Sequence, residues 1–162
     1  MTFTTYNLRS AGRIKARLAE LGHSLPQVSA AAGIYTPAVR TGSIVYTSGQ
    51  LPLADKQLLA TGQVGAEVTA DEAAALTRVC ALNALAAIET VAKLDNVTRI
   101  VKLTVFVSSA TGFNDQALVA NGASMFLKEV FDEFGVHARS AVGVAELPLD
   151  SPVEVELIVE VA

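Results

Sequence analysis

Tryptophan is absent from this 162-residue chain, cysteine occurs once and histidine twice. A single cysteine excludes an intrachain disulfide and a cysteine-based metal cluster. Cys80 lies in an alanine-rich run, where a buried, inert thiol is expected. The two histidines, His23 and His137, are far apart in the sequence, and neither belongs to an HxxxH or HExxH spacing. The sequence therefore predicts no dedicated metal site.

Motifs that bind phosphates or expose a nucleophile are also missing. Gly33, Gly42 and Gly49 are isolated, so the chain has neither a GxGxxG nor a P-loop. Ser48-Gly49 lacks the glycine two positions before the serine that a nucleophile elbow requires. Spacing alone leaves a Ser-His-Asp triad open, although neither histidine has an obvious partner in the sequence. We expect no cofactor.

Charge is sparse, at 17% of residues, and the net charge is −4, which disfavours a nucleic-acid partner. The densest basic stretch, residues 9–17, fits a solvated helix face. The longest weakly charged stretch, residues 73–91, is interrupted by Arg78, Glu89 and other polar residues, so no membrane span is expected. The first residues contain no apolar run followed by a small-residue cleavage site. We expect a cytoplasmic protein whose high mean hydropathy of +0.43 reflects apolar surface buried between copies.

Hydrophobic periodicity predicts one α+β domain with the order β-β-α-β-α-β-β after an N-terminal helix at 8–21. The other two helices are expected from a Thr69–Glu72 capping box to about Lys93, and from Asn114 to Phe134 with Leu118, Phe126 and Val130 facing inward. Strands are expected at 38–40, 44–48, 99–108, 140–145 and 153–161, with a weaker one at 57–59. Residues 1–32 are interpreted as a helical extension and residues 33–162 as the main domain.

The last strand indicates how the layers are arranged. Its odd-numbered residues from Val153 to Val161 are all apolar, whereas the intervening positions include three glutamates. Such a strand has one face suited to packing under helices and one mixed face. We therefore expect two helices on one face of a mixed sheet, with the other face available for a subunit interface.

Arg139 is the most informative candidate for chemistry. It opens a strand of mostly apolar residues, where an arginine is either a surface charge or a donor fork aimed at an anion. Glu154 begins what is expected to be the neighbouring strand, so the two side chains are expected to lie near each other. An ion pair between them is the alternative to an anion-binding site. Tyr35 and Ser48, at the ends of the first strands, carry no signal of their own.

Four sequence blocks, taken in order, resemble the RidA/YjgF family. They are Gly33-Ile34-Tyr35-Thr36-Pro37-Ala38-Val39 with Val45-Tyr46-Thr47-Ser48-Gly49-Gln50-Leu51-Pro52; Ile100 to Val107; Ala138-Arg139-Ser140-Ala141-Val142 with Leu147-Pro148; and Val153-Glu154-Val155-Glu156. The resemblance covers roughly Gly33 to Val161. It implies a chorismate-mutase-like α+β subunit that forms a homotrimer, with pockets between subunits.

The same resemblance implies hydrolytic deamination of small enamines and imines, such as 2-aminoacrylate, to 2-keto acids and ammonia without a cofactor. The family's carboxylate-binding arginine corresponds to Arg139, its water- or substrate-orienting glutamate to Glu154, and its pocket tyrosine to Tyr35. Its serine-glycine pair corresponds to Ser48 and Gly49, and a pocket asparagine to Asn121.

Three positions depart from the family pattern. Ala141 stands where a cysteine is frequent, Gly143 where a glutamate is common, and Ile34 where proline is usual. Two other interpretations stay open: a trimer that binds or senses small carboxylates without chemistry, and an endoribonuclease, an activity attached to some family members by name. The acidic composition disfavours the endoribonuclease.

Overall fold

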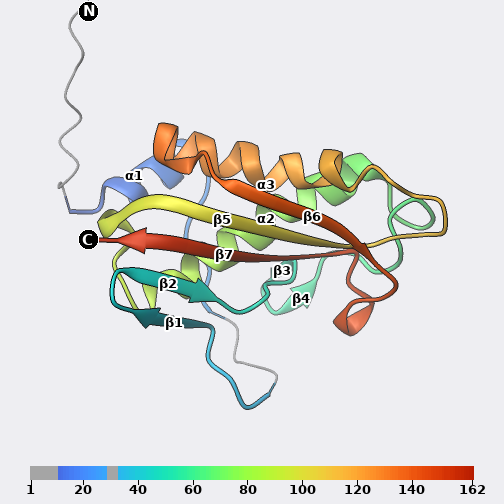
Figure 1. The fold of residues 1–162 in the computed structure, drawn as a ribbon, viewed down its shortest axis with the longest axis horizontal. Helices are drawn as coiled ribbons and strands as arrows, with labels where there is room; N and C mark the ends of the chain where they lie inside the picture. The colour runs from blue at the N-terminus through green and yellow to red at the C-terminus, as the bar shows by residue number, and fades with distance from the viewer. Residues whose placement is uncertain (1–10, 29–32) are drawn as a thin grey trace, which may run out of the picture.

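The computed structural model describes residues 11–28 and 33–162, and its main feature is a five-stranded sheet with helices on one face (Figure 1). The strand order is β1-β2-β7-β5-β6. These strands are β1 (Ala38–Thr41), β2 (Ile44–Thr47), β5 (Val97–Ser108), β6 (Ala138–Val144) and β7 (Val153–Val161). A small separate hairpin consists of β3 (Leu53–Ala54) and β4 (Gln57–Leu58). The predicted α+β architecture is confirmed.

Two long helices, α2 (Ala70–Glu89) and α3 (Gln116–Phe131), cover the sheet. The predicted capping box is present at the start of α2: the Thr69 hydroxyl accepts from the Glu72 amide, and the Glu72 carboxylate accepts from the Thr69 amide. Short 3₁₀ segments follow at Leu94–Asn96, Asp132–Gly135 and Pro148–Asp150. Within the described part of the chain, no helix is long and apolar enough to cross a membrane.

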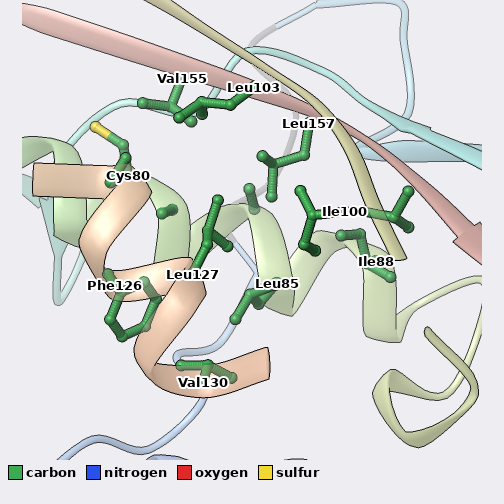
Figure 2. Close-up of a cluster of buried hydrophobic side chains, with 14 of the residues drawn as sticks. Cys80, Leu85, Ile88, Ile100, Leu103, Phe126, Leu127, Val130, Val155 and Leu157 are labelled. Atoms are coloured by element: carbon green, nitrogen blue, oxygen red, sulfur yellow. The ribbon is translucent and has the colours of Figure 1, made fainter. Parts of the chain in front are cut away.

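The core lies between the helices and the sheet. Figure 2 shows Leu103 and Leu157 from the strands facing Leu85 and Leu127 from the two helices. The predicted alternation of β7 is confirmed, because every odd-numbered residue from 153 to 161 is buried. These side chains supply the apolar face that the helices cover.

The sequence pattern placed some side chains on the wrong face. Strict alternation puts Val101 on the same face of β5 as the buried Leu103. The register of β5 against β7 shifts between Ile100 and Lys102, however, so that Ile100 is fully buried and Val101 is only partly buried. Such an irregularity inserts one residue on one strand and cannot be read from alternation alone. Leu118 of α3 was also expected to face inward, but it is 48% exposed, and the adjacent Val119 is buried instead.

The first helix, α1 (Arg13–Glu20), packs its Ile14 and Leu18 side chains into the same core. The Asp95 carboxylate accepts hydrogen bonds from the backbone amides of Gly12 and Ile14, which satisfies two donors at the start of this helix. The predicted helix began at Leu8, and positions 8–10 lie outside the described residues. The boundary placed at residue 32 stays a prediction.

Candidate functional site

Arg139 lies on β6, the outermost strand on one side of the sheet. Its register partner on β5 is Leu103, a core residue, so the Arg139 side chain points to the face that the helices cover. There it reaches α3. Nη1 donates to Asn121 Oδ1 at 2.8 Å and to Ser124 Oγ at 3.1 Å, and Nη2 donates to the Ala117 carbonyl at 3.3 Å. Asn121, predicted as a pocket residue, therefore contacts Arg139.

All three acceptors of Arg139 are neutral. The ion pairs found among residues 11–28 and 33–162 do not include this guanidinium. A guanidinium has five N–H donors, and Arg139 uses three of them on α3. The Nε–H group and one Nη2–H group are left for an external acceptor. The side chain is thus held in place, and no carboxylate of the described residues neutralises its charge.

Beside Arg139 the surface has an open hollow of about 340 Å³. It is bordered by residues of α3, of the following 3₁₀ segment and of β6, among them Ser124, Met125, Lys128, Val136 and His137. None of the described residues that border it is acidic, and the two charged ones, Lys128 and Arg139, are cations. A small anion is the ligand that fits this charge distribution.

Ser124 and His137 also belong to this region, and sequence reasoning missed both. The Ser124 hydroxyl lies 3.0 Å from His137 Nε2, and His137 Nδ1 bonds the Gly135 carbonyl. Burial lowers the pKa of His137, and the nearby Arg139 charge lowers it further, while the bond to Gly135 opposes them. The signal was available in the sequence, because His137 is two residues before Arg139, and residues two apart in extended chain share a face.

Glu154 lies elsewhere, on β7 opposite Phe106 of β5. Its carboxylate covers Gly49: a β-carbon at position 49 would lie only 1.7 Å from Glu154 Oε1. Burial raises the pKa of Glu154, and the neighbouring charge of Glu156 raises it further. The glycine predicted at this position is therefore explained by the close approach of the carboxylate.

Ser48, the residue before Gly49, holds the loop that carries Tyr35. The Ser48 hydroxyl donates to the Thr36 carbonyl at 2.7 Å, and the Ser48 amide donates to the Pro37 carbonyl at 2.8 Å. Tyr35 is one residue before Thr36 and is 55% exposed. Glu154, Gly49, Ser48 and the Tyr35 loop thus lie at the same end of the β1-β2-β7 part of the sheet.

The six predicted site residues therefore form two groups within one subunit. The expectation that Arg139 and Glu154 lie on neighbouring strands is wrong, because β5 runs between β6 and β7. The two side chains also point to opposite faces, since Arg139 pairs with Leu103 and Glu154 with Phe106, three residues further along β5. Strand spacing and rise put their Cα atoms roughly 14 Å apart. We call the Arg139 group the arginine half-site and the Glu154 group the glutamate half-site.

Two of the departures from the family pattern lie on the same face of β6 as Arg139. Ala141 packs against the core at its edge. A β-carbon at Gly143 would lie 2.8 Å from Gln116 Nε2 and 3.0 Å from Ser109 Oγ, and these two side chains are hydrogen-bonded to each other. Gln116 therefore fills the space that a glutamate at position 143 would enter. The third departure, Ile34, is fully exposed in the loop that carries Tyr35.

The family model described as "YjgF/chorismate_mutase-like, putative endoribonuclease" matches residues 15–161 of this chain. The chain belongs to the RidA/YjgF family. It is 45% identical over 153 residues to Protein TCP17 of Trypanosoma cruzi, covering 93% of this chain and 96% of that protein. It is 38% identical over 129 residues to a 2-iminobutanoate/2-iminopropanoate deaminase of Escherichia coli strain K12, covering 80% of this chain and 88% of that protein.

Solved structures of other proteins share this RidA/YjgF fold. Atu1372 of Agrobacterium tumefaciens, whose function is described as unknown, has a TM-score of 0.86 and 39% identity, with 93% of each chain covered. Escherichia coli TdcF with bound serine has a TM-score of 0.58 and 32% identity, with 85% of this chain and 94% of that one covered. The family thus includes proteins named as deaminases, and one of its structures holds a small amino acid.

Proposed function

We propose that this RidA/YjgF protein hydrolyses small carboxylated enamines and imines of the 2-aminoacrylate type to 2-keto acids and ammonia. The observation that carries the proposal is the Arg139 guanidinium, fixed by three neutral acceptors and beside a hollow that no carboxylate borders. A guanidinium fork with two remaining N–H groups suits a substrate carboxylate. The deaminase name of the relative in Escherichia coli supports the chemistry.

Fixing the carboxylate places the adjacent C=N group at a defined position, which removes much of the entropic cost of hydrolysis. The reaction then requires a proton on the substrate nitrogen, a positioned water molecule, and no electron transfer. Glu154 would orient that water, and its raised pKa reflects a carboxylate shielded from solvent. Ser48 and Gly49 would close the pocket from the same side.

Because Arg139 and Glu154 lie far apart and on opposite faces of the sheet within one subunit, the proposal needs a second copy of the chain. We place each pocket between two subunits of a homotrimer, with the arginine half-site of one copy facing the glutamate half-site of the next. The uncovered face of the sheet is apolar enough for such contacts: Val39, Tyr46 and Val142 are 51%, 46% and 42% exposed on it. Exposed apolar patches of this kind mark association surfaces.

A second function is favoured by one observation. The arginine half-site is complete within a single subunit, whereas the glutamate half-site is not part of it. A protein that only binds or senses small carboxylates needs the arginine half-site alone. The two functions make different predictions for the same assay.

The test generates 2-aminoacrylate in situ and measures its loss together with release of keto acid and ammonia. Wild-type protein should accelerate hydrolysis, and Arg139→Ala should reduce the acceleration by about 100-fold or more, because the carboxylate is no longer held. Arg139→Lys is the matched control, since it keeps the charge but not the bidentate fork. It should recover little of the activity.

If the wild-type protein is inactive but its melting temperature still rises with 2-ketobutyrate, the deaminase function is overturned and the carboxylate-sensing function is supported. Cleavage of RNA that persists in Arg139→Ala would indicate an endoribonuclease activity or a contaminant, and neither depends on the arginine half-site.

A further inference from the structure

Three polar side chains form a continuous chain on the floor of the arginine half-site. The Ser124 hydroxyl lies between Arg139 Nη1, at 3.1 Å, and His137 Nε2, at 3.0 Å. The far ring nitrogen, Nδ1, contacts the Gly135 carbonyl. Ser124 comes from α3, Arg139 from β6, and His137 from the segment just before β6, so the crossover from helix to strand brings them together.

The hydrogen-bond partners determine where the protons lie. A carbonyl can only accept a hydrogen bond, so Nδ1 of His137 is protonated and donates its hydrogen bond to the Gly135 carbonyl. Nε2 of the neutral ring is then an acceptor, and the Ser124 hydroxyl donates to it. The lone pairs of the same hydroxyl accept from Arg139. A proton leaving Ser124 would therefore move directly onto His137, while Arg139 stabilises the serine oxygen.

The surroundings keep His137 in the neutral form that such a transfer needs. Burial lowers the pKa of His137, the Arg139 charge adds to this effect, and the Gly135 bond only partly opposes it. Among the described residues, the charged side chains that border the hollow are Arg139 on β6, two residues after the histidine, and Lys128 on α3. None of the described residues that border it carries a carboxylate that would stabilise an imidazolium.

We propose that His137, acting through the Ser124 hydroxyl, is the proton acceptor and donor for hydrolysis of a substrate held by Arg139. This inference rests on the proposed deaminase function and assigns a residue pair that the family pattern does not predict. His137 is a positioning residue that acts through Ser124, and Ser124 is the group that touches the attacking water.

The steps balance without a cofactor. A lone pair of water forms the C–O bond at C2 of the iminium substrate, and the C=N π electrons move to nitrogen. One water proton passes to Ser124, which gives its own proton to Nε2 of His137, leaving a carbinolamine and an imidazolium. The imidazolium then returns the proton to the amine through Ser124. The C–N bond breaks with its electron pair on nitrogen, the remaining O–H proton leaves for the released ammonia, and the 2-keto acid forms.

The arrangement also divides the work between the two half-sites. The proton acceptor belongs to the subunit that binds the carboxylate, within hydrogen-bond reach of the hydroxyl that Arg139 contacts. Glu154 then orients water or substrate from the other half-site and need not titrate during the reaction.

The experiment compares wild-type protein with His137→Gln, Ser124→Ala and, as a matched control, His23→Gln. His23 is the only other histidine of the chain. It packs edge-on against Phe126, with 5.5 Å between the ring centroids, outside the arginine half-site. His137→Gln should lower kcat by about 100-fold, while KM and the affinity for 2-ketobutyrate change little, because Arg139 is intact. Ser124→Ala should lower kcat similarly. His23→Gln should keep the wild-type kcat.

The pH profile separates proton transfer from a structural role. Wild-type kcat should fall as the pH drops below the ordinary histidine value of 6.5, because protonated His137 cannot accept a proton. His137→Gln should lose this acidic limb while remaining folded, as judged by its melting temperature. If the wild type is active and both kcat and the acidic limb are unchanged in His137→Gln and Ser124→Ala, proton transfer through Ser124 to His137 is overturned. The deaminase function is then unaffected. A wild type without deaminase activity overturns the proposed function itself, and the proton transfer through Ser124 and His137 with it.

Discussion

At the scale of single residues, Glu89 and Glu154 show how the fold treats two shielded carboxylates differently. Glu89 accepts from Lys15 at 2.9 Å and from the Leu94 amide at 2.8 Å, and Lys93 is also near. Burial acts to raise its pKa, but these hydrogen bonds and charges outweigh burial, and the pKa lies below its ordinary value. Glu154 has no cation paired with it in the described chain, and its pKa is raised. The first carboxylate is neutralised by cations of the subunit, whereas the second has no such partner within the described chain.

This contrast predicts the effect of Glu89→Gln on stability. A depressed folded-state pKa contributes stability that is present above the unfolded value of 4.5 and is lost as the pH falls through the folded value. Glu89→Gln should therefore lower the free energy of unfolding at pH 7 by on the order of 1 kcal/mol. Glu20→Gln, which breaks only the exposed pair with Arg17, should cost a few tenths. Urea titrations should show the difference shrinking below pH 4.5; a difference that persists in acid would contradict the assignment.

At the scale of elements, the contact between α2 and α3 depends on Gly122. A β-carbon there would lie 1.9 Å from the Ala74 carbonyl oxygen and 2.6 Å from Thr77 Oγ1. The two helices therefore approach as closely as their backbones allow, and this position sets the height of α3, with Asn121 and Ser124, above β6.

Gly122→Ala should destabilise the fold by about 1–3 kcal/mol, because the backbone of α2 cannot move out of the way. The sign is the opposite of the usual effect in a helix, where alanine is favoured over glycine by about 1 kcal/mol. Lys128→Ala, at an exposed position of the same helix, serves as the control and should change stability little. Thermal unfolding measures both. An increased melting temperature for Gly122→Ala would show that the helices can separate without cost.

Sequence patterns predicted the elements where the signal was local. The Thr69–Glu72 cap and the alternation of β7 are local features, and both are confirmed. The shifted register at Ile100 depends on the partner strand, so alternation could not reveal it. The position of β5 between β6 and β7 likewise depends on the crossover through α3, since β5 and β6 pair in parallel. This is why the site residues could be named from a resemblance while their grouping into two half-sites could not.

At the scale of the whole molecule, the two half-sites predict complementation between inactive variants. Arg139→Ala keeps an intact glutamate half-site, and Glu154→Ala keeps an intact arginine half-site. If pockets form between neighbouring copies of a closed trimer, each mixed trimer should contain one pocket with both halves intact. A one-to-one mixture refolded together should then recover roughly a quarter of the wild-type activity.

Light scattering should give the mass of three chains for each variant and for the mixture. Arg139→Ala mixed with itself is the matched control and should stay inactive. Activity that fails to return in a mixture of proven trimers would show that Arg139 and Glu154 act within one subunit.

The guanidinium of Arg139 also has a consequence for the solvent around it. Since only neutral groups contact this cation in the described chain, any small inorganic anion can occupy the donors that a substrate would use. Sulfate and phosphate are therefore expected to compete there with the proposed substrates, and dissolved salt should weaken the attraction further by screening. Affinities for this chain have meaning only when the buffer ions are specified.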